Sequence, residues 1–201
     1  GITFTMILLN NFGASDPDLL PVDSPVEGVG NYAFNSTTPE GETAVRNYAR
    51  TMANYYGDYV SNWVIGNEVN DAAQWDYNGI SDMDEHAASY AITFRIFYEE
   101  IKAVNPEARV FIPFDMRWKA TNDPLRYTVS EYLPKLNALL KDTEYGIAWH
   151  PYPVHFFDKP EFMDDDGISF DINTTPNINM KNLDLLTSYM QNADMLAPDG
   201  S

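Results

Sequence analysis

The sequence predicts an α/β fold in which four parallel strands alternate with four helices. Short runs rich in Val, Ile, Phe and Trp alternate with longer segments whose apolar residues recur every three or four positions, and this alternation indicates parallel strands with right-handed crossovers. The connections from helix to strand are short, whereas those from strand to helix are long. Irregular residues are therefore expected at the carboxyl face of the sheet, where loops build binding sites.

Four apolar runs predict the strands. In the second run, Trp63, Val64 and Ile65 are bulky or β-branched and too few for a helix, which favours a fully buried parallel strand. Gly66 interrupts this run, so the residues after it are expected at the carboxyl end of the strand. The predicted strands are residues 2–9, 62–65, 109–114 and 145–150.

Helical periodicity separates these strands. Thr38 precedes a proline that suits the first helical position, and Gly57 is expected to end this first helix. Ser81 and Asp84 have capping-box spacing before a second helix that ends near Asn105. The remaining two helices are predicted at residues 130–141 and from residue 182 onwards, and the polar loop up to about residue 38 is expected to lack regular structure.

Composition limits the classes of function. The 201 residues are 44% hydrophobic and 14% aromatic, which is enough for one core, and no interior linker divides them, so residues 1–201 are expected to form a single domain. The formal charge of -18 disfavours nucleic acid and anionic membranes as partners, and fits a neutral or cationic substrate. The lack of cysteine excludes disulfides, thiolate zinc sites and cysteine nucleophiles. No segment approaches the roughly 20 apolar residues of a membrane span.

Asn67 and Glu68 are the first candidates for chemistry, because they follow a buried strand and a glycine. In α/β sheets, ligands and catalytic groups gather at the carboxyl ends of the strands. Asn67 has an alternative explanation in the preference of asparagine for turns, and Glu68 in an ordinary ion pair at the start of a loop. A later strand ends in the sequence Trp-His-Pro-Tyr, which places His150 and Tyr152 at the same face.

With these motifs, the chain resembles the clan of (β/α)8-barrel retaining glycoside hydrolases that includes families 5 and 39. In that clan the fourth strand ends in Asn-Glu, the Glu being the acid/base, and the sixth strand often offers a His or Tyr. The resemblance implies a partial (β/α)8 TIM barrel covering strands three to six, with Glu68 as the general acid/base. Full barrels need about 250 residues, so we expect a fragment that lacks the nucleophile carboxylate of the seventh strand.

Under this resemblance, further residues are candidates for binding a sugar. Asn67 would donate to a 2-hydroxyl, and His150 or Tyr152 would orient a carboxylate or bind a hydroxyl, although a structural histidine is nearly as good an explanation. Trp118 and Trp75 lie in loops and would stack on a sugar ring, whereas core packing explains Trp149 better. The remaining candidates are Asp115, as a polar contact or a partner of Arg117, and Asn10 at the end of the first strand.

We therefore expect a secreted or periplasmic glycosidase that binds a poly- or oligosaccharide, with no cofactor and no metal ion. The acidic run 164–167 lacks the alternate spacing of a calcium loop and is expected to be a solvated charge run. Two alternatives are a carbohydrate-binding protein without turnover, and a doubly wound sheet that binds another small molecule. Exposed sheet edges would favour a homo-oligomer, for which two half-barrels side by side is one arrangement.

Overall fold

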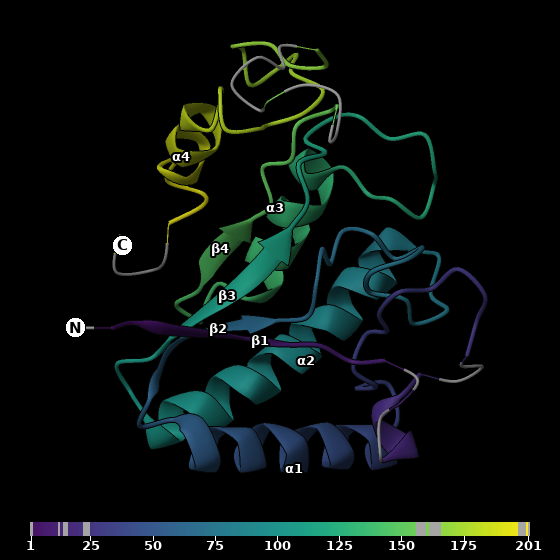
Figure 1. The fold of residues 1–201 in the computed structure, drawn as a ribbon, viewed down its shortest axis with the longest axis vertical. Helices are drawn as coiled ribbons and strands as arrows, with labels where there is room; N and C mark the ends of the chain where they lie inside the picture. Colours follow the sequence, from purple (N-terminus) through teal and green to yellow (C-terminus); the bar gives the residue numbers. More distant parts are fainter. Residues whose placement is uncertain are drawn as a thin grey trace.

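The computed structural model describes residues 2–11, 13, 16–21, 25–155, 160, 166–196 and 200. Within them, four parallel strands form one sheet in the order β1-β2-β3-β4, and they alternate with helices as the sequence predicted (Figure 1). Each strand pairs with the next along the chain, from Leu8–Ile65 in the first pair to Phe114–Trp149 in the last, and the first pair has one register shift between Phe4 and Thr5. The strands are β1 Phe4–Leu8, β2 Val60–Ile65, β3 Arg109–Phe114 and β4 Gly146–Trp149.

The helices begin close to their predicted positions. The Thr38 side chain caps the first helix by accepting a hydrogen bond from the Gly41 amide, and Pro39 takes the first helical position. The second helix is capped by Asp82, whose side chain accepts from two backbone amides, so the predicted capping box starting at Ser81 was wrong. The helices are α1 Pro39–Tyr56, α2 Met83–Val104, α3 Val129–Leu139 and α4 Asp184–Met190, and a short 3-10 helix, η1 Pro17–Leu19, interrupts the first loop.

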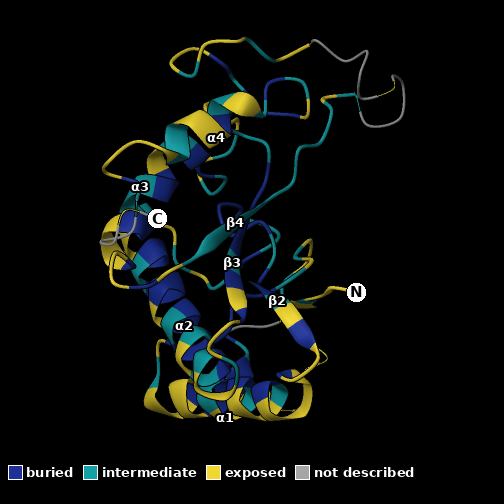
Figure 2. Ribbon diagram, turned by 90° about the vertical axis from the view of Figure 1, so that its left-hand side faces the viewer, coloured by how far each residue is buried: buried dark blue, intermediate teal, exposed yellow. Residues whose placement is uncertain are grey.

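The core lies between the sheet and the layer formed by α1, α2 and α3. These helices lie along one face of the sheet, and no helix of the described residues covers the opposite face (Figure 2). Trp63 and Ile65 of β2 are fully buried, as predicted, and they share the core with Phe94 and Phe97 of α2. Burying these side chains anchors β2, because each large apolar side chain contributes about 2 kcal/mol.

β1 is an end strand of the sheet, and two of its apolar residues are exposed. Phe4 and Ile7 each keep 55% of their surface accessible, although both are apolar. The predicted homo-oligomer through sheet edges stays a prediction. No helix among the described residues has the length and apolar character needed to cross a membrane.

The long loops gather where the strands end. Figure 1 shows the segments that follow β1, β2 and β3 on one side of the sheet, opposite the short turns that lead into β2, β3 and β4. Isolated bridges join these loops, between Asn10 and Tyr32, Tyr32 and Tyr77, and Asp71 and Arg126. The loops therefore support one another and build a common surface at the carboxyl face.

Candidate functional site

The turn after β2 presents Glu68 at this face. Gly66 has a φ of 86°, and Glu68 itself has a φ of 44°, a left-handed conformation that side-chain-bearing residues rarely adopt. Both neighbouring strands hold the turn, since Gly66 donates to the Leu8 carbonyl of β1 and Val69 donates to the Pro113 carbonyl of β3. A strained backbone held by its surroundings is typical of functional sites.

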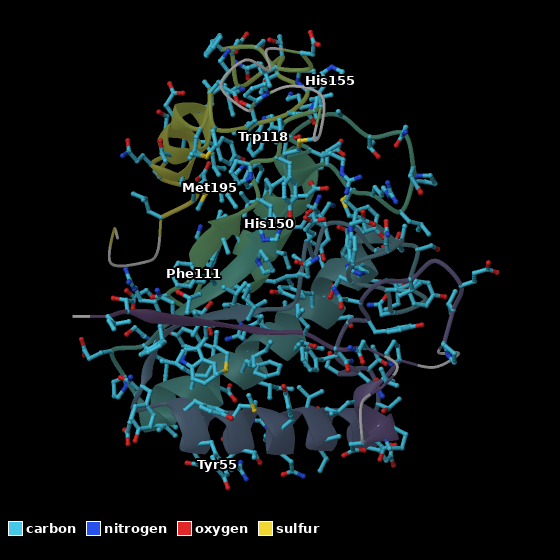
Figure 3. All side chains as sticks on the ribbon, in the orientation of Figure 1. Tyr55, Phe111, Trp118, His150, His155 and Met195 are labelled. Atoms are coloured by element: carbon cyan, nitrogen blue, oxygen red, sulfur yellow. The ribbon has the colours of Figure 1, made fainter. Side chains whose placement is uncertain are left out.

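Glu68 contacts the histidine that the sequence placed at the same face. The Glu68 side chain is buried, and its Oε1 lies 2.9 Å from Nδ1 of His150, which follows β4 (Figure 3). The Tyr152 hydroxyl lies 3.2 Å from the same nitrogen. Burial, and then the neighbouring Glu68 carboxylate, raise the pKa of Tyr152 to about 12. The phenol therefore stays protonated at neutral pH and can act as a hydrogen-bond donor.

A charged network lies beside this group. Arg117 Nη2 is 2.7 Å from Asp71 Oδ2 and also pairs with the Asp115 carboxylate, the contact that the sequence proposed for Asp115. Arg126 Nε lies 3.3 Å from the same Asp71 oxygen. Burial raises the pKa of Asp115, although the Arg117 guanidinium and the Asn70 amide act in the opposite direction. Both aspartates are thus committed to arginine partners.

Asn70 joins the turn after β2 to this network. It is fully buried, and its Nδ2 donates to Asp115 Oδ1 at 2.8 Å and to the Tyr127 carbonyl at 3.1 Å. Its Oδ1 accepts from the Asp115 amide at 3.1 Å. Because every polar atom of this side chain is used, Asn70 fixes the end of β3 relative to the Glu68 turn.

We expect the substitution Asn70→Ala to lower the free energy of unfolding by about 3 kcal/mol, because it leaves the Asp115 amide and the Tyr127 carbonyl without their hydrogen-bond partner and removes one donor to the Asp115 carboxylate. Urea unfolding of the 201-residue chain measures this change. Asn62→Ala is the matched control, since that amide makes its hydrogen bonds at the exposed end of the sheet. Equal losses in the two variants would contradict the role of Asn70.

A pocket of about 340 Å³ opens over these groups. Glu68, Asp115 and Tyr152, all candidates from the sequence, line it together, and Trp75 also lines it. Asn67 is half-buried, makes no side-chain hydrogen bond within the described chain and is not among the lining residues. The structure therefore brings together the candidates from β2, β3 and β4.

Two candidates, Trp118 and Asn10, do not line this pocket, and the structure buries both of them. Trp118 is 1% exposed, donates through Nε1 to the Ile172 carbonyl and packs edge-on against Tyr189, so its ring is a core element (Figure 3). Asn10 is buried, and its Nδ2 donates to the carbonyls of Leu19 and Ala33. Both of these hydrogen bonds of the Asn10 amide therefore hold the first loop.

Trp149 and the other two histidines make contacts within the fold. Trp149 is half-buried and donates to the Ile178 carbonyl. His86 lies in the core, and His155 pairs with Asp166 at the surface. In the described part of the chain, no cluster of His, Asp or Glu is arranged to hold a metal ion. Asp164 and Asp165 of the predicted charge run lie outside the described residues.

Sequence reasoning missed Asp71, Gln74 and Arg126, which line the same pocket. They lie in polar loops without periodicity, and Asp71 and Arg126 are far apart in sequence. The nearest available signal is that Asp71 follows Glu68 by three residues, and such spacing has no specific meaning in a loop.

The fold and the site define part of a parallel α/β barrel with a carboxylate at the mouth of its strands. The structure is similar to the GH53 catalytic domain of Ignisphaera aggregans, with a TM-score of 0.50 and 18% sequence identity. The match covers 76% of this chain and 38% of that one, so the chain spans less than half of that barrel. At this identity the likeness shows the fold. It agrees with the predicted partial (β/α)8 barrel.

Residues 1–201 match the family of unknown function DUF5722 over their whole length. The chain belongs to that family. Comparison with curated proteins gives no match.

Proposed function

We propose that this chain forms part of a retaining glycoside hydrolase, with Glu68 as the general acid/base. The observation that carries the proposal is the buried Glu68 carboxylate, 2.9 Å from His150 and lining a pocket at the carboxyl face of a parallel sheet. A carboxyl group in this place can protonate the leaving oxygen of a glycoside and later activate water. The distant likeness to a glycoside hydrolase barrel supports the proposal.

A retaining enzyme also needs a nucleophile about 5 Å from the acid/base. Asp71 and Asp115 lie in the same pocket, but their carboxylates are held by Arg117 and serve as its counter-ions. We therefore assign the nucleophile to a strand beyond the four of this sheet.

The test is an assay of the full-length protein and its Glu68→Gln variant on a panel of aryl glycosides. The variant keeps the shape of the side chain and loses the proton, so hydrolysis should fall at least about a hundredfold. Equal rates in the two proteins would remove Glu68 from the mechanism. Circular dichroism of both proteins controls for folding.

The ion-paired state of Asp71 and Asp115 also favours a second candidate function, a carbohydrate-binding protein without turnover. Under this alternative the pocket binds a saccharide, and the full-length protein releases no product. The same assay, combined with a binding measurement, separates the two functions.

A further inference from the structure

The pocket beside Glu68 contains groups that the proposed acid/base chemistry does not use. Trp75 and Gln74 come from the loop after β2, and Arg117 and Arg126 come from the loop after β3. A backbone bridge between Asp71 and Arg126 joins the two loops. These residues therefore form one continuous wall of the pocket.

The guanidinium groups of Arg117 and Arg126 are held in place, but not all of their N–H donors make hydrogen bonds. Arg117 uses Nη2 for both aspartates, and its Nε is buried without a hydrogen-bond partner. Arg126 uses Nη2 to donate to Gln74 Oε1 at 3.1 Å. Within the described chain, Nη1 of neither arginine makes a hydrogen bond, so each fixed group has donors left for a ligand.

The charge balance of this wall favours a neutral ligand. Asp71 and Asp115 compensate the charges of Arg117 and Arg126, and Glu68 adds a further carboxylate to the same pocket. The chain as a whole carries a formal charge of -18. An anionic sugar would therefore meet an unfavourable potential, whereas sugar hydroxyls can donate to the carboxylates and accept from the guanidinium groups.

Trp75 supplies an apolar surface in the same pocket. A Cβ on Gly30 would lie 2.3 Å from Cζ3 of the indole, so the ring packs directly on the backbone of this glycine. The Gly30 amide also donates to the Gln74 carbonyl at 2.8 Å, which fixes the two loops together. An indole held in this way can stack on the C–H face of a pyranose.

We propose that Trp75, Arg117 and Arg126 form a subsite for a neutral pyranose unit next to Glu68. The sugar ring stacks on Trp75, and its neighbouring hydroxyls accept hydrogen bonds from the two arginines. The proposal rests on the proposed function, because it names the substrate class of the same pocket.

The test measures calorimetric binding to the full-length Glu68→Gln variant, which prevents turnover. The probes are β-1,4-linked glucose, mannose and galactose oligosaccharides and the uronate counterpart of each, so each pair differs only at C6. At least one neutral probe should bind about tenfold more tightly than its uronate. Trp75→Ala and Arg126→Ala should each weaken that binding about tenfold. Gly30→Ala should also weaken it, since the added Cβ displaces the indole.

Arg95→Ala is the matched control, because Arg95 pairs with Asp142 on the helical side of the molecule. It should leave binding unchanged. The proposal would be overturned if a uronate binds more tightly than its neutral counterpart and Arg117→Ala abolishes this binding. In that case the arginines would bind the carboxylate of the sugar. The proposal would also be overturned if no probe binds. The same holds if a neutral oligosaccharide binds to Trp75→Ala and Arg126→Ala with unchanged affinity.

The failure of this subsite can be told from failure of the proposed function. A neutral oligosaccharide that binds, and binds more weakly to Trp75→Ala and Arg126→Ala, would support the subsite. If the wild-type protein then hydrolyses no glycoside, the glycosidase is rejected. The opposite result is hydrolysis that depends on Glu68 and has the same KM in Trp75→Ala and Arg126→Ala as in the wild type. It would support the glycosidase and reject the subsite.

Discussion

Replacement of Glu68 by alanine is expected to make hydrolysis by the full-length protein depend steeply on the leaving group. A glycoside with a basic leaving group needs the proton of the acid/base, so its kcat/KM should fall about a thousandfold. The dinitrophenolate of a dinitrophenyl glycoside leaves without being protonated, so the rate at which this substrate forms the glycosyl-enzyme should change little. The measurement is a series of aryl glycosides of increasing leaving-group basicity, assayed with wild type and variant.

Azide extends this experiment to the second step. In the Glu68→Ala variant, the cavity left by the carboxylate admits azide, which needs no general base and should restore turnover of the dinitrophenyl substrate. The product should be a glycosyl azide of retained configuration. Glu107→Ala is the control, because Glu107 is exposed in the turn before β3. A loss of the same size for every leaving group would show that Glu68 has only a structural role.

His86 is expected to give the fold a strong dependence on pH between about 6.5 and 4. Its ring is fully buried, with Nδ1 2.7 Å from the Tyr132 hydroxyl and Nε2 3.0 Å from the Asp76 carbonyl. Burial lowers the pKa of His86 to about 4, and the Asp76 carbonyl offsets part of that effect. In the unfolded chain His86 takes up a proton near pH 6.5, whereas in the folded chain it does so only near pH 4. The free energy of unfolding therefore falls as the pH is lowered from about 6.5 to 4, by about 3 kcal/mol in total.

Asp76 acts with the opposite sign in the same place. Burial raises the pKa of its carboxyl well above the usual range, so the folded chain keeps a proton that the unfolded chain releases as pH rises above about 4. The contribution of His86 is therefore isolated by comparing the unfolding free energies of wild type and His86→Gln at pH 4.5 and 7. The wild type should lose more stability than the variant on acidification. His155→Gln controls for removal of a surface imidazole, and identical pH dependence in wild type and His86→Gln would contradict the prediction.

The elements closest to prediction are those whose signals are local. β3 was predicted with its observed bounds, and α1 begins at the predicted proline, because strand and cap signals lie within a few residues of the element they define. The cap of α2 was misplaced by one residue, since Ser81 and Asp82 both suit the position and only the backbone geometry selects Asp82. The contact between Glu68 and His150 was also expected, because parallel strands place their carboxyl ends at one edge.

Loop residues could not be assigned in the same way. Trp118 looked available for a ligand, but the Ile172 carbonyl and the Tyr189 ring, far along the chain, bury it. Asp71 and Arg126 carried no recognisable pattern, yet their loops meet in the folded chain. The sequence alone determined the order of strands and helices, the face that bears the loops and the carboxylate at the end of β2, because these follow from periodicity and from where strands end. The tertiary structure decided which loop side chains line the pocket and which are used by the fold, because that choice depends on contacts between segments distant in sequence.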